Sequence, residues 1–338
     1  MPSAEGRPTL RTALRAAVRR LEKAHLSYGH GTTNASDEAA WLVLHSLGLP
    51  PDELAPHLPR LLTADEARRI EALIKERIVT RKPAAYLTHE AWLGDHRFYV
   101  DERVIVPRSY IAELLRDGLT PWAPRKVHVT LDLCTGSGCL AILTALTFPR
   151  ARVDGSDISR EALTVARRNV AEYGLGRRVR LIRSDLYETL HSRRYDLIVS
   201  NPPYVRDAVM RKLPAEYRRE PALALAGGRD GLDLVKHIVR QAPAHLNEGG
   251  LLVVEVGHNK ARVERAFREL PLTWPQTSGG GDCVFLITRE ALLAASPDPF
   301  PRARRAAASP LPRAAGSPDR ALTAAAARRH RSARGSAG

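Results

Sequence analysis

One short segment of this 338-residue chain, Ser200-Asn201-Pro202-Pro203-Tyr204, combines residues that could do chemistry with a rigid backbone. Proline lacks the amide hydrogen that a sheet interior needs, so the preceding strand must end here. The residue before a proline stays extended, and two successive prolines fix φ. The segment therefore predicts a stiff loop that directs the Asn201 side chain away from a strand end.

These residue types suit methyl transfer to a planar nitrogen, which is a weak nucleophile because its lone pair is delocalised. The Asn201 side-chain oxygen and the Pro202 carbonyl can each accept a hydrogen bond from such a nitrogen. Tyr204 can pack on the flat face of the target, and an aromatic ring also suits a sulfonium cation. Positioning would do most of the work. The predicted catalytic residues are Asn201, Pro202, Pro203 and Tyr204, and an amide or an exocyclic base amine both fit them.

A glycine turn after an earlier strand, from Asp132 to Gly138, predicts a cofactor loop. Glycine permits positive φ and close approach of the backbone to a ligand. Asp157 stands nineteen residues after Gly138, where a carboxylate can accept from both ribose hydroxyls. Asp185-Leu186 could accept from an adenine amino group and pack beside the ring. NAD and S-adenosylmethionine both fit. The predicted cofactor residues are Asp132, Cys134, Thr135, Gly136, Ser137, Gly138, Asp157, Asp185, Leu186 and Asn201.

The elements that must position these residues alternate between strand and helix from Lys126 onward. Alternation of this kind predicts an α/β fold with a mostly parallel sheet covered on both faces, and ligands at the carboxyl ends of its strands. The strand candidates are 127–134, 151–157, 179–183, 195–200, 251–256 and 284–288. The helical candidates between them are 139–148, 160–173, 232–245 and 260–270.

The first part of the chain predicts a small helical bundle. Apolar residues recur at helical spacing from Leu10 to Leu21, Ser36 is a candidate helix cap, and Thr63-Ala64-Asp65-Glu66 is a capping box. Residues 91–106 are rich in aromatic and β-branched types, with Gly94-Asp95 as a turn. They predict a β-hairpin that links the bundle to the α/β part.

Charge and composition set the remaining expectations. The net charge of +15 suggests a polyanionic neighbourhood; residues 296–338 carry nine Arg, no Lys and two Asp, which leaves +8 for the rest. The composition of that tail predicts disorder, and a solvated tail is favoured over a loose contact with RNA. The chain has an odd number of cysteines, which predicts reduced thiols; they are Cys134, Cys139 and Cys283. No zinc spacing, membrane span or signal segment is evident, so we expect a soluble cytoplasmic protein with no metal site.

Taken together, these motifs resemble the HemK-type glutamine methyltransferases over about residues 10 to 290. The resemblance implies a Rossmann-like class I methyltransferase domain with a mostly parallel seven-stranded sheet, preceded by a helical bundle and a β-hairpin. It implies S-adenosylmethionine as the cofactor and a glutamine amide as the target. Cys134 stands where many members have a glycine. The implied domains are a helical substrate-recognition domain at 1–88, a hairpin linker at 89–108, a methyltransferase domain at 109–295 and a tail at 296–338.

Within that family, Pro107-Arg108-Ser109-Tyr110-Ile111 resembles the branch that acts on large-subunit ribosomal protein L-three, where Pro-Arg-Ser-Pro-Ile is usual. Release-factor enzymes usually carry Pro-Arg-Pro-x-Thr-Glu, and the acid is absent here. The resemblance thus implies ribosomal protein L-three or a ribosome-assembly precursor as partner, and the basic charge adds non-specific contact to rRNA. Further stretches similar to this branch are Tyr28–Thr32, Cys134–Cys139, Glu220-Pro221 and Asp230-Gly231-Leu232.

Four alternatives remain open from the sequence. A release-factor glutamine methyltransferase would share the chemistry, and a methyltransferase for adenine or another exocyclic amine could use the same loop. An NAD-dependent dehydrogenase would leave residues 201–204 unexplained. A non-enzymatic ribosome-assembly factor would tolerate Asn201→Ala. His30, between two glycines, fits a turn or a role in substrate recognition, whereas Glu220 and Asp230 fit the ordering of a loop or the positioning of a substrate.

Overall fold

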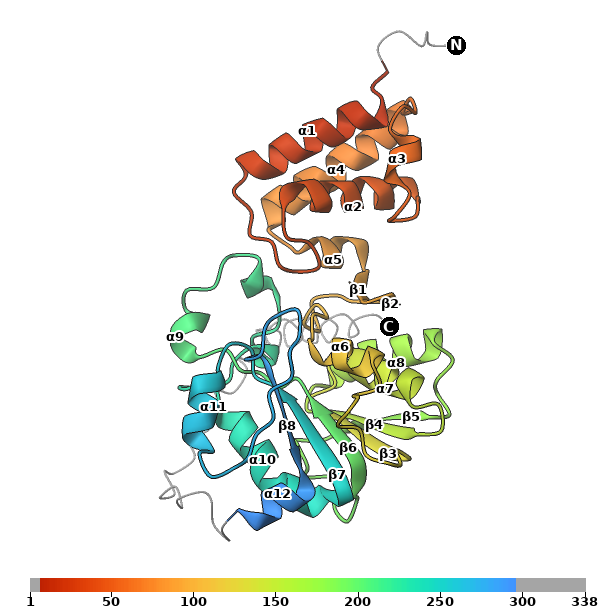
Figure 1. The fold of residues 1–338 in the computed structure, drawn as a ribbon. Helices are drawn as coiled ribbons and strands as arrows, with labels where there is room; N and C mark the ends of the chain where they lie inside the picture. Colours follow the sequence, from red (N-terminus) through yellow and green to blue (C-terminus); the bar gives the residue numbers. More distant parts are fainter. Residues whose placement is uncertain (1–6, 296–338) are drawn as a thin grey trace, which may run out of the picture. The chain divides into compact units, whose positions relative to one another are not determined.

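A computed structural model describes residues 7–295, and the predicted tail at 296–338 lies outside the described residues. The described chain begins with a group of helices and continues into a layered α/β arrangement (Figure 1). The first group comprises α1 (Leu10–Lys23), α2 (Ala35–Leu47), α3 (Leu54–His57), α4 (Ala64–Thr80) and α5 (Ala84–Thr88).

Helices α1, α2 and α4 pack around a shared apolar core, as the helical spacing predicts. Leu21, Leu42 and Ile74 are fully or almost fully buried in it. The capping box at Thr63 and Glu66 forms as predicted. The prediction of Ser36 as a cap was wrong: the Asn34 side chain accepts from the backbone amide of Asp37 and so satisfies an orphan donor, which starts α2 two residues earlier.

The predicted hairpin is formed by β1 (Ala91–Leu93) and β2 (His96–Phe98), which pair antiparallel. Gly94 turns the chain between them with φ of +59°, a conformation that favours glycine. The chain then enters α6 (Ile111–Arg116) before it reaches the sheet.

The main sheet has six strands in the order β5-β4-β3-β6-β7-β8. The first five are parallel and β8 is antiparallel to β7. Helix α7 contacts both α6 and α8, and α10 contacts α12. Helices lie on both sides of the strands (Figure 1). The strands are β3 (Val129–Leu133), β4 (Arg152–Asp157), β5 (Val179–Arg183), β6 (Tyr195–Ser200), β7 (Leu246–Glu255) and β8 (Val284–Thr288). The helices are α7 (Cys139–Thr147), α8 (Arg160–Glu172), α9 (Asp207–Met210), α10 (Asp233–His245), α11 (Lys260–Ala266) and α12 (Arg289–Ala294).

The α/β class is confirmed, but the expected count of seven strands was wrong for the described residues. The segment that would extend the sheet beyond β8 makes a single antiparallel bridge, at Thr273 and Leu286. Thr273 exchanges two hydrogen bonds there, of 3.0 and 2.8 Å. The next ladder donors would lie two residues away on each side, and both are prolines, Pro271 and Pro275. Since proline has no amide hydrogen, the ladder cannot extend.

The central strands β3 and β6 are buried on both faces, as helix-covered parallel strands should be, whereas the edge strand β5 is largely half-buried or exposed. Leu131, Ile198 and Val253, from three neighbouring strands, are fully buried. Between residues 7 and 295, no helix has both the length and the apolar character that crossing a membrane requires.

Candidate active site

A cavity of about 230 Å³ lies where the carboxyl ends of β3, β4, β5 and β6 meet. Because these strands are parallel neighbours, the residues that follow each of them converge on one edge of the sheet. Residues about seventy positions apart in the chain thereby line a single space. Seven of the predicted site residues contribute to its wall, namely Cys134, Gly136, Asp157, Asp185, Leu186, Asn201 and Pro203.

Asp157 closes the loop between β3 and α7. One of its carboxylate oxygens accepts from the Gly136 amide and the other from the Ser159 amide, each at 2.9 Å. Burial raises the pKa of Asp157, while these amides oppose the rise. Ser159 caps α8 by itself, as expected. Asp157 therefore faces the cavity with two oxygens that each retain acceptor capacity.

The other predicted cofactor residues lie outside the cavity wall and shape the loop from behind. Asp132 is fully buried and accepts from the Thr135 hydroxyl at 2.5 Å and from the Ala141 amide at 2.8 Å. Burial raises the pKa of Asp132 to about 7. Ser137 is buried, and Gly138 packs so tightly on α8 that an added Cβ would lie 3.1 Å from the Ala166 side chain. These residues set the path of the turn.

The segment Asn201 to Tyr204, called the Asn-Pro-Pro-Tyr loop below, is held by close contacts with three glycines. A Cβ at Gly227 would lie 2.6 Å from the Tyr204 Cα, and one at Gly231 would lie 2.6 Å from the Tyr204 carbonyl oxygen. A Cβ at Gly257, whose φ is +53°, would lie 2.7 Å from the tyrosine ring. Asn259 adds a hydrogen bond to the Tyr204 carbonyl at 3.3 Å. Pro202 and Tyr204 lie outside the cavity wall and brace Asn201 and Pro203, which line it.

Sequence reasoning missed Glu255, a buried acid at the end of β7. One of its oxygens accepts from the Ser109 hydroxyl at 2.6 Å and from the Tyr110 amide at 2.9 Å. The other accepts from the Tyr204 hydroxyl at 3.4 Å. Burial raises the pKa of Glu255 to about 7. The available signal was an acid directly after the apolar run at residues 251–254.

Glu255 should make stability depend on pH. Because its pKa of about 7 in the folded chain exceeds the ordinary 4.5, the native state holds a proton that the unfolded chain releases as pH rises between these values. Wild-type protein should lose about 3 kcal/mol of stability across that window through this group. Glu255→Gln has no proton to lose, so its unfolding free energy should fall less between pH 5 and pH 8. Equal falls in the two proteins, measured by chemical denaturation, would contradict this, and Glu269→Gln is the exposed control.

Glu220 joins two of the stretches that the sequence singled out. Its carboxylate accepts from Arg108 at 2.6 and 2.7 Å and from the Val106 amide at 2.9 Å. Burial opposes its ionisation, but the hydrogen bonds from Arg108 and the nearby His30 ring lower the pKa of Glu220 to about 2. The next residue, Pro221, lines the cavity. Glu220 therefore orders a loop, and it ties the segment before α6 to a wall of the site.

His30 meets the same loop from the helical part of the chain. Its Nε2 lies 3.4 Å from a Glu220 oxygen, and its ring lies 4.3 Å from the Tyr217 ring. Arg77 and Arg81, at the end of α4, lie 3.6 and 3.2 Å from the Glu216 carboxylate. The residues after the Asn-Pro-Pro-Tyr loop are thus anchored at several points to the helical part.

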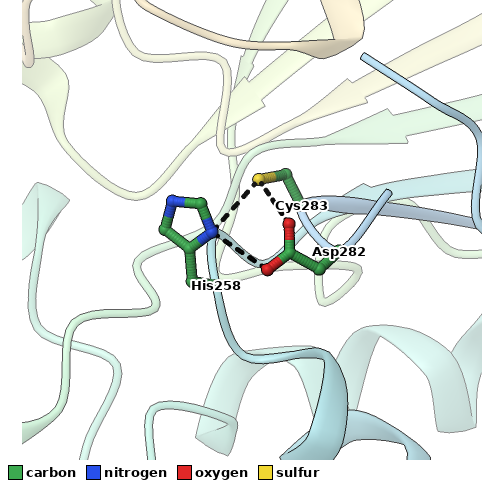
Figure 2. Close-up of side chains that lie close together, drawn as sticks. All are labelled: His258, Asp282 and Cys283. Atoms are coloured by element: carbon green, nitrogen blue, oxygen red, sulfur yellow. Dashed lines mark hydrogen bonds and ion pairs between the residues drawn. The ribbon is translucent and has the colours of Figure 1, made fainter. Parts of the chain in front are cut away.

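A second polar cluster lies beside this loop, between the start of α11 and the start of β8. His258 Nδ1 lies 3.0 Å from Asp282 and 3.7 Å from the Cys283 sulfur (Figure 2). Within residues 7–295 these three side chains form the group that could hold a metal ion. The pair Cys134 and Cys139 is not part of it. The absence of a metal site stays a prediction.

Comparison with known proteins decides the family. Residues 12–88 match the PrmC N-terminal domain and residues 113–216 match the methyltransferase small domain. A ribosomal protein uL3 glutamine methyltransferase of Bordetella pertussis is 55% identical over 286 residues, which cover 84% of this chain and 96% of that protein. The chain belongs to the uL3 glutamine methyltransferase family.

Two further relatives with the same name show how far this family extends. The protein of Neisseria meningitidis serogroup B is 55% identical, with 84% of this chain and 94% of that protein covered. The protein of Bradyrhizobium diazoefficiens is 49% identical, with 82% and 90% covered. The resemblance to HemK-type glutamine methyltransferases is confirmed, and so is the assignment as an enzyme that transfers methyl groups.

Proposed function

We propose that this protein transfers a methyl group from S-adenosylmethionine to the side-chain amide nitrogen of a glutamine in ribosomal protein uL3. The observation that carries the proposal is the convergence of Asn201, Asp157 and Asp185 on one cavity in a chain of this family. An acceptor for an amide thereby shares a space with two carboxylates suited to a nucleoside. This combination favours a methyltransferase over a dehydrogenase, because a dehydrogenase mechanism would not use the Asn201 side chain.

The residues in the cavity wall suit S-adenosylmethionine. Asp157 would accept from the ribose hydroxyls, Asp185 would accept from the adenine amino group, and Leu186 would pack on the base. The turn at Gly136 brings backbone close to the ligand. When bound, the cofactor supplies an electrophilic methyl group on a sulfonium. Cys134 lines the cavity at the position where many family members have glycine. Its backbone still adopts a positive φ of 64°, so the substitution keeps the conformation of the turn.

The Asn201 side-chain oxygen would accept a hydrogen bond from one N–H of the target amide. Pro202 lies behind the cavity wall, and its backbone carbonyl would accept a hydrogen bond from the other N–H. Methyl transfer to this nitrogen would leave the cofactor as a thioether and would release one proton from the nitrogen to water. The rigid Asn-Pro-Pro-Tyr loop would fix the position of the nitrogen, and positioning would supply most of the rate. Tyr204, packed on Gly257, braces the loop from behind.

The wider assignments belong to the same proposal. Residues 1–88 would recognise the substrate, and residues 109–295 would carry the methyltransferase chemistry. Residues 89–108 would link these two domains. The substrate would be uL3, free or in a ribosome-assembly precursor, with non-specific contact to rRNA, in the cytoplasm.

Labelled S-adenosylmethionine distinguishes the candidate substrates. The enzyme should label uL3, either free or in undermethylated particles, and the label should survive nuclease treatment. Label on release factors in place of uL3 would contradict the substrate assignment. Loss of the label to nuclease would point to a nucleic-acid amine, and an absence of turnover on every substrate would favour an assembly factor.

A further inference from the structure

A basic groove lies at the edge of the sheet opposite the candidate active site. Its volume is about 850 Å³, and it includes Val129, Arg152, Val179 and Tyr195, which begin β3, β4, β5 and β6. Parallel strands place their amino ends together at one edge and their carboxyl ends at the other. The arginine groove is defined by Arg152, Arg167, Arg177, Arg178, Arg180, Arg193 and Arg194.

Three of these arginines are held by the acid of the groove wall or by the end of a helix. Asp154, the acid in the groove wall, pairs with Arg180 at 3.0 Å and with Arg193 at 2.8 Å. Arg178 donates to the Ala145 carbonyl at 2.7 Å and so satisfies the end of α7. The Asp154 carboxylate and the carbonyl at the end of α7 therefore bind these three side chains within the protein.

The other four arginines have no carboxylate partner among the described residues. Arg152 and Arg177 are exposed, and within residues 7–295 neither makes a side-chain hydrogen bond or an ion pair. Arg167 donates to the Thr164 hydroxyl at 3.4 Å, and Arg194 donates to the Leu246 carbonyl at 3.1 Å. Four guanidinium groups around one concavity repel one another, and a bound polyanion would relieve that repulsion.

The shape and chemistry of the groove suit a nucleic-acid backbone. Apolar side chains form part of its lining, with Val129 left 38% exposed, while the guanidinium groups stand around it. Its basic residues are all arginines, whose planar forks bind phosphate oxygens in a bidentate manner. Phosphates at the rim with sugars or bases over the apolar part would satisfy both features.

We propose that the arginine groove binds the sugar-phosphate backbone of RNA, and that it brings the enzyme to uL3 while that protein assembles on RNA. The second half rests on the proposed function, whereas RNA binding by the groove does not. Because the groove lies at the edge opposite the candidate active site, bound RNA leaves the Asn-Pro-Pro-Tyr loop open to its substrate.

A second basic stripe on the same chain supplies a matched control. Arg11, Arg15 and Arg19 are exposed and recur every four residues along α1, on one face of that helix. The triple change R11Q, R15Q and R19Q removes as much charge as R152Q, R167Q and R177Q. If overall charge alone attracts RNA, the two triple variants should lose the same affinity.

The test titrates the full chain into a labelled single-stranded oligouridylate at several salt concentrations, without cofactor or protein substrate. The groove triple should bind at least about tenfold more weakly than wild type. Its plot of log affinity against log salt should be shallower by about 2, since each lost phosphate contact in single strands removes about 0.7. The α1 triple should keep most of the affinity and the steeper slope.

Three results would overturn the proposal: equal losses in both triples, no loss in the groove triple, or preferential binding of an oligoglutamate peptide, which would indicate an acidic protein partner. Circular dichroism checks that each variant is folded. Methylation of free uL3 without RNA by the groove triple should match wild type. Failure of the proposed function would thus appear as missing methylation, while failure of the groove would appear only in the titration.

Discussion

Asn201→Ala should lower methyl transfer to uL3 by about a hundredfold or more while S-adenosylmethionine still binds. The reason is geometric: Asn201 lines the cavity next to Pro203, and its side-chain oxygen is the acceptor that would hold the target nitrogen. Removal of one preorganised polar group from a reacting centre typically costs 10²–10³ in rate. Steady-state kinetics with uL3 give the loss in turnover, and equilibrium titration gives the cofactor affinity.

Asn247→Ala is the matched control, because Asn247 bonds to Asp196 at the opposite end of β6 from Asn201. It should retain wild-type turnover. If Asn201→Ala keeps most of its turnover, the catalytic role assigned to the loop is wrong. If instead it loses cofactor binding, Asn201 serves mainly to hold the cofactor.

Glu220→Gln should have the largest effect on stability, with a loss of about 3 kcal/mol near neutral pH. The variant leaves Arg108 beside an uncharged group in a largely buried site, and it removes the partner that His30 shares. Since ionised Glu220 is favoured in the folded chain, its contribution is present above about pH 4.5 and is lost as pH falls toward 2. Urea denaturation at pH 7 and at pH 3.5 measures both effects.

Glu172→Gln provides the contrast. Glu172 pairs with Arg168 one helical turn away, on an exposed surface, and such pairs contribute only about 0.3–0.5 kcal/mol. A double change of Glu220 and Arg108 should cost less than the sum of the single changes, because the pair is lost as a unit. The account would be contradicted if the losses in unfolding free energy from the Glu220 and Arg108 changes were additive. Equal losses from Glu220→Gln and Glu172→Gln would also show that the buried pair does not hold the loop.

Much of the fold could be predicted because its signals are local. Strands and helices alternate in the sequence, and proline ends β6 just before Asn201. The sheet falls one strand short of the expected number because Pro271 and Pro275 remove the donors that a seventh strand would need. The resemblance implies seven strands, whereas the two prolines in the sequence oppose the seventh.

The residues of the candidate site also divide into those that the sequence could predict and those that it could not. Residues that follow strands, such as Asp157 and Asn201, could be placed together because parallel strands share an edge. Glu255 could not be placed, since its partners Ser109 and Tyr204 lie far away in the sequence. The link from Arg108 to Glu220 also spans more than one hundred residues, and only the folded chain shows that these two family signatures are one ion pair.

The mass of uL3 from cells with and without this gene tests the central claim most directly. We predict that uL3 carries a methyl group on a glutamine when the gene is present and lacks it when the gene is absent. A gene that encodes Asn201→Ala should fail to restore the methyl group. An unchanged mass of uL3, with a methyl group missing from release factors or from nucleic acid instead, would contradict the account.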